Sequence, residues 1–158
     1  MEAAAENARK LLGNFRDRQA GLFHIQHLSE HPGSTFFLPC TEGVKTHAMV
    51  TPGPGEKVVE KHYPNSFRDT VLLNELRGRG ISDLVICGAM SHMCIDATTR
   101  AAFDYGFNCT VIQDACATRD LSFSGDTIRA ADVHGAFMAA LAVPYARVLA
   151  TEQYLSDP

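Results

Sequence analysis

The sequence predicts an α/β fold in which helices cover both faces of a parallel sheet, giving three layers. Strand-like runs alternate with helical patterns along the chain, and the strand-like runs are continuously apolar, as in "LVICGA". Strands that are buried on both faces have this pattern, and the helices that connect them cover the sheet. The length of 158 residues fits one domain, which we expect to span residues 1–158.

The first half of the chain predicts a helix, two strands and a long loop. Strands are expected at residues 21–28 and 58–61. The segment 29–55 between them is rich in Pro, Gly, Thr and His and has no hydrophobic period, so we interpret it as a loop of the kind that often borders a site. Residues 2–18 predict a helix, because four apolar side chains share one stripe at helical spacing: Ala8, Leu11, Leu12 and Phe15.

The second half of the chain alternates helix and strand regularly. Its central part has the order strand, helix, strand, which is a βαβ unit with parallel strands. Gly106 ends the helix of this unit, and Pro144 ends the helix that follows it. The expected elements are a helix at 69–79, a strand at 83–88, a helix at 94–105, a strand at 107–113, a helix at about 124–142 and a strand at 146–150.

Composition limits the partners and the location of the protein. The net charge is -4 and no basic face stands out, which disfavours a nucleic-acid partner. The start "MEAAAENARK" lacks the apolar core of a signal peptide, and no apolar run is long enough to cross a bilayer. We therefore expect a cytoplasmic protein with a small-molecule substrate and no membrane partner.

The cysteines and histidines do not form a metal-binding or disulfide pattern. Five cysteines without a CxxC pair argue against a disulfide framework and a zinc knuckle, and Cys87 and Cys109 lie in apolar strands, where we assign them to the core. In "HIQHLSEH", His24 and His27 lie in a strand, so their spacing of three places them on opposite faces. We expect no metal and no cofactor.

Cys94 and Lys61 are the candidate catalytic residues. Cys94 follows an apolar strand, a glycine and a short turn, and it stands at the start of a helix, where the positive end of the dipole favours a thiolate nucleophile. The alternative is a buried structural thiol. Lys61 ends the strand "KVVEK", and the carboxyl ends of parallel strands meet at one edge, so its charge would favour the thiolate. The alternative for Lys61 is a solvated edge lysine.

Two further polar residues lie near this edge. His92 stands in the turn before Cys94 and could act as a base, but we favour a turn residue that faces solvent or substrate. Asp114 ends the next strand, where an N-capping or turn role is favoured over a role in substrate orientation.

Three segments together resemble the isochorismatase-like cysteine hydrolases, which include nicotinamidases and ureidoacrylate amidohydrolases. The segments are "VVEKHYPNSF", "GISDLVICGAMSHMCIDATTRAAFDYGFNCTVIQDACATRD" and "ADVHGAFMAAL". The resemblance implies a six-stranded parallel sheet and a triad of aspartate, lysine and cysteine, with Cys94 as nucleophile and Lys61 as the lysine. It also implies a cis peptide at Ala89–Met90 and an oxyanion hole formed by the N–H groups of Met90 and Cys94. We expect substrate contacts from His62, Phe67 and His92.

The sequence departs from the family pattern at its start. The family's aspartate ends the first strand, and that strand has no counterpart in this chain, so we expect an N-terminally truncated domain with unpaired strand edges. Isochorismatases proper, which cleave a vinyl ether, often lack the cysteine. The resemblance therefore implies hydrolysis of an amide or ureido-type C–N bond through a Cys94 thioester, by a homo-oligomer such as a dimer or tetramer. The alternative is a non-catalytic family member that binds a small molecule or forms an oligomeric scaffold.

Overall fold

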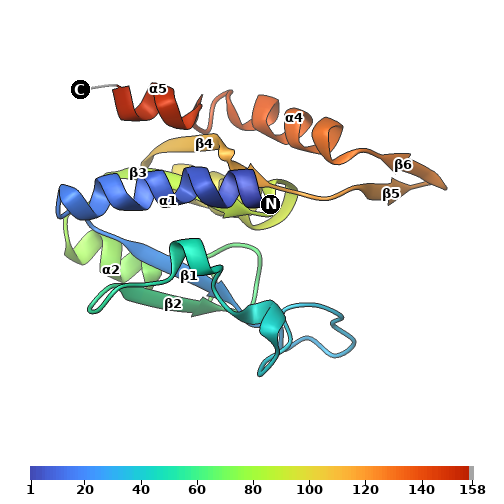
Figure 1. Ribbon diagram of the computed structural model, residues 1–158, viewed down its shortest axis with the longest axis horizontal. Helices are drawn as coiled ribbons and strands as arrows, with labels where there is room; N and C mark the ends of the chain where they lie inside the picture. Colours follow the sequence, from blue (N-terminus) through green and yellow to red (C-terminus); the bar gives the residue numbers. More distant parts are fainter. Residues whose placement is uncertain (157–158) are drawn as a thin grey trace.

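The strands of the computed structural model, which describes residues 1–156, form two parallel sheets and one antiparallel hairpin (Figure 1). One parallel sheet has the order β1-β2 and the other has the order β3-β4-β7, while β5 and β6 form the hairpin. The strands are β1 (Phe23–His27), β2 (Lys57–Lys61), β3 (Asp83–Ala89), β4 (Asn108–Ala117), β5 (Leu121–Phe123), β6 (Asp126–Ile128) and β7 (Arg147–Leu149).

Five α-helices and three shorter helical turns are present in the described residues. The α-helices are α1 (Glu2–Asp17), α2 (Leu72–Gly78), α3 (Asp96–Asp104), α4 (Ala130–Leu141) and α5 (Thr151–Ser156). The turns are the 3₁₀ segments η1 (Glu42–Val44) and η2 (Ala48–Val50) and the π-helical turn η3 (Ser91–Ile95). None of these helices is long and apolar enough to cross a membrane.

Helices cover both faces of the larger sheet, so the predicted three-layer α/β fold is confirmed. Val111 and Ile112 follow one another in β4 and are fully buried on opposite faces, because side chains alternate along a strand. Ile112 packs with Leu11 of α1, and Val111 packs with Met138 of α4. In Figure 1, α1 crosses in front of β3 and β4, and α4 and α5 lie above them.

The smaller sheet joins the same core through apolar side chains. Val59 of β2 is buried in a cluster with Leu76 of α2, Ala102 of α3 and Cys109 of β4. Strands β1 and β3 each have one hydrogen-bonded neighbour, β2 and β4 respectively. Packing rather than strand pairing therefore holds the two sheets together.

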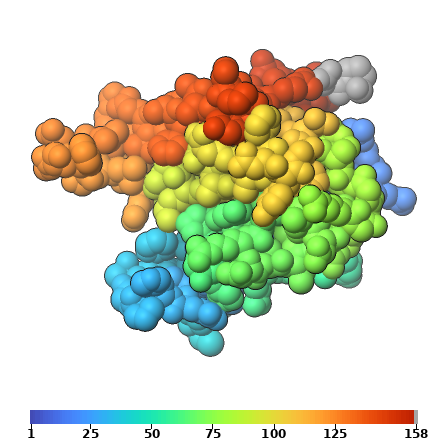
Figure 2. Space-filling view, turned by 180° about the vertical axis from the view of Figure 1, so that it is seen from behind, coloured from blue at the N-terminus to red at the C-terminus, as the bar shows by residue number. Residues whose placement is uncertain are grey.

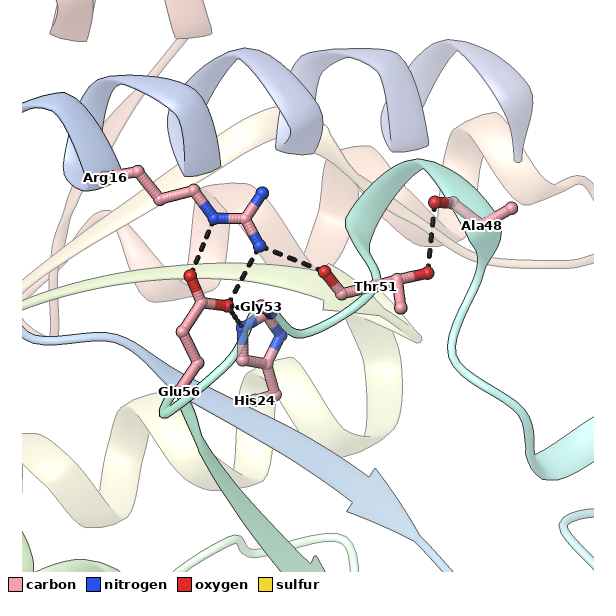
Figure 3. A network of polar contacts seen from close by, with 6 residues as sticks. All are labelled: Arg16, His24, Ala48, Thr51, Gly53 and Glu56. Carbon is pink, nitrogen blue, oxygen red and sulfur yellow. Dashed lines mark hydrogen bonds and ion pairs between the residues drawn. The ribbon is translucent and has the colours of Figure 1, made fainter.

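A polar network adds a second connection between α1 and the smaller sheet (Figure 3). Glu56, directly before β2, receives hydrogen bonds from Arg16 of α1 at 2.7 and 2.9 Å, and its carboxylate lies 2.7 Å from Nε2 of His24 in β1. Arg16 also donates to the Thr51 carbonyl at 3.0 Å. These contacts lower the pKa of Glu56 to about 2, with the Arg16 hydrogen bond as the largest cause.

The predicted helix at about 124–142 was wrong in its first part. Residues 121–128 instead form the β5–β6 hairpin, and α4 begins at Ala130. Ser124 and Gly125 both have positive φ, at 53° and 88°, which is the backbone of the two-residue turns that join antiparallel strands. Helix α5 was not predicted; Asp114 accepts from the Thr151 N–H and hydroxyl at its start, at 2.8 and 2.7 Å. This fits the capping role favoured for Asp114.

Candidate active site

The carboxyl ends of β1 and β2 bring two basic side chains together. His27 and Lys61 are partners in the parallel register of these strands. Lys61 is only 2% exposed, and its Nζ donates a hydrogen bond to the Pro64 carbonyl at 2.5 Å. A buried ammonium group needs partners that compensate for its lost hydration. For Lys61 these partners are the Pro64 carbonyl and Cys94.

Cys94 lies in the π-helical turn η3, between the end of β3 and the start of α3. Its side chain is buried. The peptide bond Ala89–Met90 at the beginning of this turn is cis. The Met90 carbonyl accepts hydrogen bonds from the N–H groups of Met93 and Ile95, which stand on either side of Cys94 in the sequence.

Two hydrogen bonds from outside the turn hold η3 in place. Ser91, which is fully buried, bonds through its hydroxyl to Nδ1 of His134 on α4 at 2.8 Å. His92 bonds through Nδ1 to the Thr118 hydroxyl, beyond the end of β4, at 2.6 Å. Helix α4 and the segment that follows β4 therefore both hold the turn in position.

The thiol, the lysine and the histidine meet at this edge of the sheets. The Cys94 Sγ lies 3.7 Å from Nδ1 of His27. Burial lowers the pKa of Lys61 below its usual value, while the charge of Cys94 and a hydrogen bond to it oppose that shift. Burial and then the charge of Lys61 lower the pKa of His27, so its imidazole is mostly neutral at pH 7. The cluster brings together a thiol, a buried amine and an imidazole.

The remaining thiols have a different environment. Burial raises the pKa of Cys87 and Cys109 to about 11 and that of Cys116 to about 12, and Cys40 is exposed. Cys109 belongs to the core cluster, and Cys87 packs against two others, as expected for small apolar side chains.

The three predicted substrate contacts lie in different surroundings. His92 is half-buried beside Thr118, and burial followed by the charge of Arg119 lowers its pKa. His62 points Nδ1 at the Leu28 carbonyl, 2.9 Å away, at the end of the smaller sheet. Phe67 is 7% exposed and stacks on Phe107 in the core, so its expected contact with a substrate stays a prediction.

A pocket of about 480 Å³ opens next to the nucleophile turn. Phe36, Phe37 and Leu38 of the loop after β1 line it, together with Met90 and Arg119. The ring of Phe37 stacks on the ring of His27 at a centroid distance of 5.0 Å. Phe37 therefore lies between the pocket and the Cys94 cluster, and the long loop after β1 borders both.

The two histidines of β1 point toward different groups. His24 and His27 face different partners, since His24 bonds to Glu56 and His27 lies against Cys94. In residues 1–156 there is no group of three His, Cys, Asp or Glu side chains placed to hold a metal ion. No metal centre is proposed.

Comparison with known proteins identifies the family. A family model of the isochorismatase domain matches residues 1–153. The chain belongs to the isochorismatase family. It is 50% identical over 154 residues to the uncharacterized isochorismatase family protein YddQ of Bacillus subtilis, covering 98% of this chain and 86% of that protein. A crystal structure of an isochorismatase-hydrolase candidate from Oleispira antarctica is 50% identical with a TM-score of 0.92, covering 98% of this chain and 82% of that one.

Two relatives within the isochorismatase family have names that state a reaction. Streptothricin hydrolase of Streptomyces noursei is 38% identical over 126 residues, which is 78% of this chain and 49% of that protein. Ureidoacrylate amidohydrolase RutB of Variovorax paradoxus is 34% identical over 87 residues, which is 55% of this chain and 33% of that protein. This isochorismatase-family chain is accordingly a hydrolase by family.

Sequence reasoning missed His27 as a site residue. It considered His27 only as a possible metal ligand together with His24. The position of His27 at the carboxyl end of its strand could have identified it, as the same position identified Lys61. The carboxyl ends of parallel strands meet at one edge of the sheet. The structure brings Cys94, Lys61 and His27 together and leaves Phe67 in the core.

Proposed function

We propose that the protein is a cysteine hydrolase that cleaves an amide or ureido-type C–N bond through a thioester on Cys94. The observation that carries this proposal is the placement of the Cys94 Sγ 3.7 Å from the His27 ring nitrogen and in contact with the buried Lys61. A thiol beside a neutral imidazole and a cation is the arrangement that activates a cysteine nucleophile.

The substrate class follows from what a thiolate attacks. A thiolate adds to a carbonyl carbon, which an amide or a ureido group has and a vinyl ether lacks. The names of the relatives RutB and streptothricin hydrolase support hydrolysis, and the first of them names an amidohydrolase. We assign the oxyanion hole to the N–H groups of Met90 and Cys94, which lie in the turn that follows the cis peptide Ala89–Met90.

Proton transfer in the proposed mechanism is assigned to His27. Its neutral ring accepts the thiol proton of Cys94, and the thiolate then forms the C–S bond while the carbonyl electron pair moves to oxygen. Collapse of this intermediate breaks the C–N bond, and the departing nitrogen takes the proton from His27. Water then gives a proton to His27 and attacks the thioester, which releases the carboxylic acid and restores the thiolate. Lys61 stays positively charged and stabilises the thiolate throughout.

The test is to look for both turnover and the acyl-enzyme. Small amides and ureido compounds are supplied to the wild-type protein, to Cys94→Ala and to Cys40→Ser, which removes the exposed thiol. We expect amine release and an acyl adduct on the peptide that contains Cys94, both absent in Cys94→Ala and retained in Cys40→Ser. Turnover that survives Cys94→Ala would exclude the thioester mechanism. A protein that binds these compounds without turnover or adduct would instead fit the non-catalytic alternative.

A further inference from the structure

Aromatic side chains and one cationic side chain line the pocket beside the turn that carries Cys94. Phe36 and Phe37 meet edge to face at a centroid distance of 5.1 Å, and the Arg119 guanidinium lies 5.7 Å from the Phe36 ring centroid. The loop after β1 and the β5–β6 hairpin project from the same end of the molecule, and the surface recedes between them (Figure 2). Arg119 stands two residues before Leu121, where that hairpin begins, and it lines the pocket.

Two residues that line the pocket are directly linked to the proposed site. Met90, which lines the pocket, begins the turn that carries Cys94, and Phe37 stacks on His27. A substrate whose carbonyl carbon lies at the Cys94 Sγ can therefore extend its remaining atoms along Phe37 toward Arg119. A volume of about 480 Å³ accommodates a small organic body between these two points.

Arg119 is available to a ligand. Within residues 1–156 its guanidinium has no ion pair and no hydrogen bond to an acceptor, and its contact is the ring of Phe36. The neighbouring carboxylate of Asp120 is already engaged, since it accepts from the Ala130 N–H at 2.7 Å at the start of α4. The positive charge of Arg119 reaches into the site, where it contributes to the lowered pKa of His92.

We propose that Arg119 and the Phe36–Phe37 wall form a specificity subsite for a carboxylate carried on an apolar or aromatic part of the substrate. A guanidinium offers two parallel N–H donors that match the two oxygens of a carboxylate, and the aromatic wall covers the apolar part. The preferred substrate is thus an amide or ureido compound that bears a carboxylate some atoms away from the scissile bond. This subsite rests on the proposed function, because it assumes attack by Cys94.

The test compares two alkylating reagents that differ only in charge. N-iodoacetylglycine carries a carboxylate and N-iodoacetylglycinamide carries a neutral amide in its place, and the β-alanine pair extends the reach by one methylene. Second-order rates of Cys94 alkylation are measured by peptide mass spectrometry in wild type, Arg119→Gln, Arg119→Lys and Arg18→Gln. Arg18 is an exposed arginine at the end of α1 and controls for the loss of one charge.

We expect Arg119→Gln to slow the carboxylate reagents about fivefold or more and to leave the neutral reagents unchanged within about twofold. Arg119→Lys restores part of the rate, and Arg18→Gln has no effect. Equal slowing of both reagent classes, or no slowing of either, overturns the subsite while leaving Cys94 as a nucleophile.

Failure of Cys94 to react with any reagent would instead contradict the proposed function. In that case the subsite is judged by binding, with N-acetylglycine and N-acetylglycinamide titrated against the arginine Nε–H signals in NMR spectra. A shift caused by the carboxylate, absent with the amide and lost in Arg119→Gln, supports the subsite; identical responses to both compounds overturn it.

Discussion

Replacement of Lys61 by Met tests whether the cation activates the Cys94 thiol. Met has a similar length and no charge, so the substitution removes the contact between the ammonium and Cys94 while filling most of the same space. Hydrogen bonds that involve a charged group contribute about 1.5 to 3 kcal/mol, and their loss corresponds to a change of about tenfold or more in thiolate reactivity. We expect Cys94 in Lys61→Met to react with iodoacetamide about tenfold more slowly than in wild type.

The labelling rates of the other cysteines are the reference against which the rate of Cys94 is compared. A pKa of about 11 leaves roughly one thiol in ten thousand ionised at pH 7, and a pKa of about 12 leaves roughly one in a hundred thousand. Cys87, Cys109 and Cys116 should therefore label far more slowly than Cys94 in the folded protein. The exposed Cys40 would compete for reagent, so the experiment is performed in a Cys40→Ser background.

The assay is a short exposure to iodoacetamide at neutral pH followed by peptide mass spectrometry. Lys57→Met is the matched control, because Lys57 begins the strand that Lys61 ends and pairs with Glu75 at 2.8 Å, away from the thiol. Slow labelling of Cys109 in every variant shows that the fold is intact. The reasoning is refuted if Cys94 labels no faster than Cys109, or if Lys61→Met and Lys57→Met affect Cys94 equally.

Three further predictions concern the proton acceptor, the link between the sheets and the assembly. His27→Gln should lower turnover about 100-fold or more and abolish the rise of rate with pH through the lowered pKa of His27, whereas an unchanged pH profile would assign the proton transfer elsewhere. Glu56→Gln should destabilise the protein by about 1 to 2 kcal/mol in urea unfolding at pH 7, since its pKa of about 2 gives an upper limit near 3 kcal/mol and Arg16 is 39% exposed. Because the folded pKa is lowered, this stabilisation is present above about pH 4.5 and lost toward pH 2, so the two proteins should converge in acid; a constant difference would contradict the assignment. A homo-oligomer stays a prediction, supported by Phe123 at 73% exposure on the projecting hairpin, and light scattering that finds a monomer would contradict it.

The sequence predicted those parts of the site that depend on local order along the chain. An apolar strand, a glycine and a turn place Cys94 at the start of a helical segment, and parallel strands place Lys61 at the same edge. His27 was missed because alternation along β1 was used only to separate it from His24. That alternation is observed, and it is the reason that His27 is turned toward the thiol while His24 is turned toward Glu56.

Two further features depend on interactions that short patterns do not contain. Phe67 stands in a motif next to the lysine strand, but the stacking partner that buries it, Phe107, is 40 residues away in the chain. The segment "LSFSGDTI" alternates around a Ser-Gly turn, and this was hidden by the helical pattern that begins at Ala130. In both cases the local sequence was compatible with two different structures. The stack on Phe107 decided the position of Phe67, and the turn with positive φ decided the conformation of the hairpin.

The geometry of the candidate site depends on how two sheets are held together without pairing between β1 and β3. Lys61 and His27 belong to the smaller sheet, whereas Cys94 follows the larger one. Their separation is consequently set by the apolar cluster around Val59 and by the Arg16–Glu56 contact, since no ladder of backbone hydrogen bonds spans the two strands. A ladder fixes strand spacing at about 4.8 Å, whereas side-chain packing can adjust by larger amounts. Phe37 stacks on His27 of the smaller sheet, and that histidine lies within hydrogen-bonding distance of the Cys94 thiol at 3.7 Å. Packing between the two sheets therefore sets the contact on which the proposed proton transfer depends.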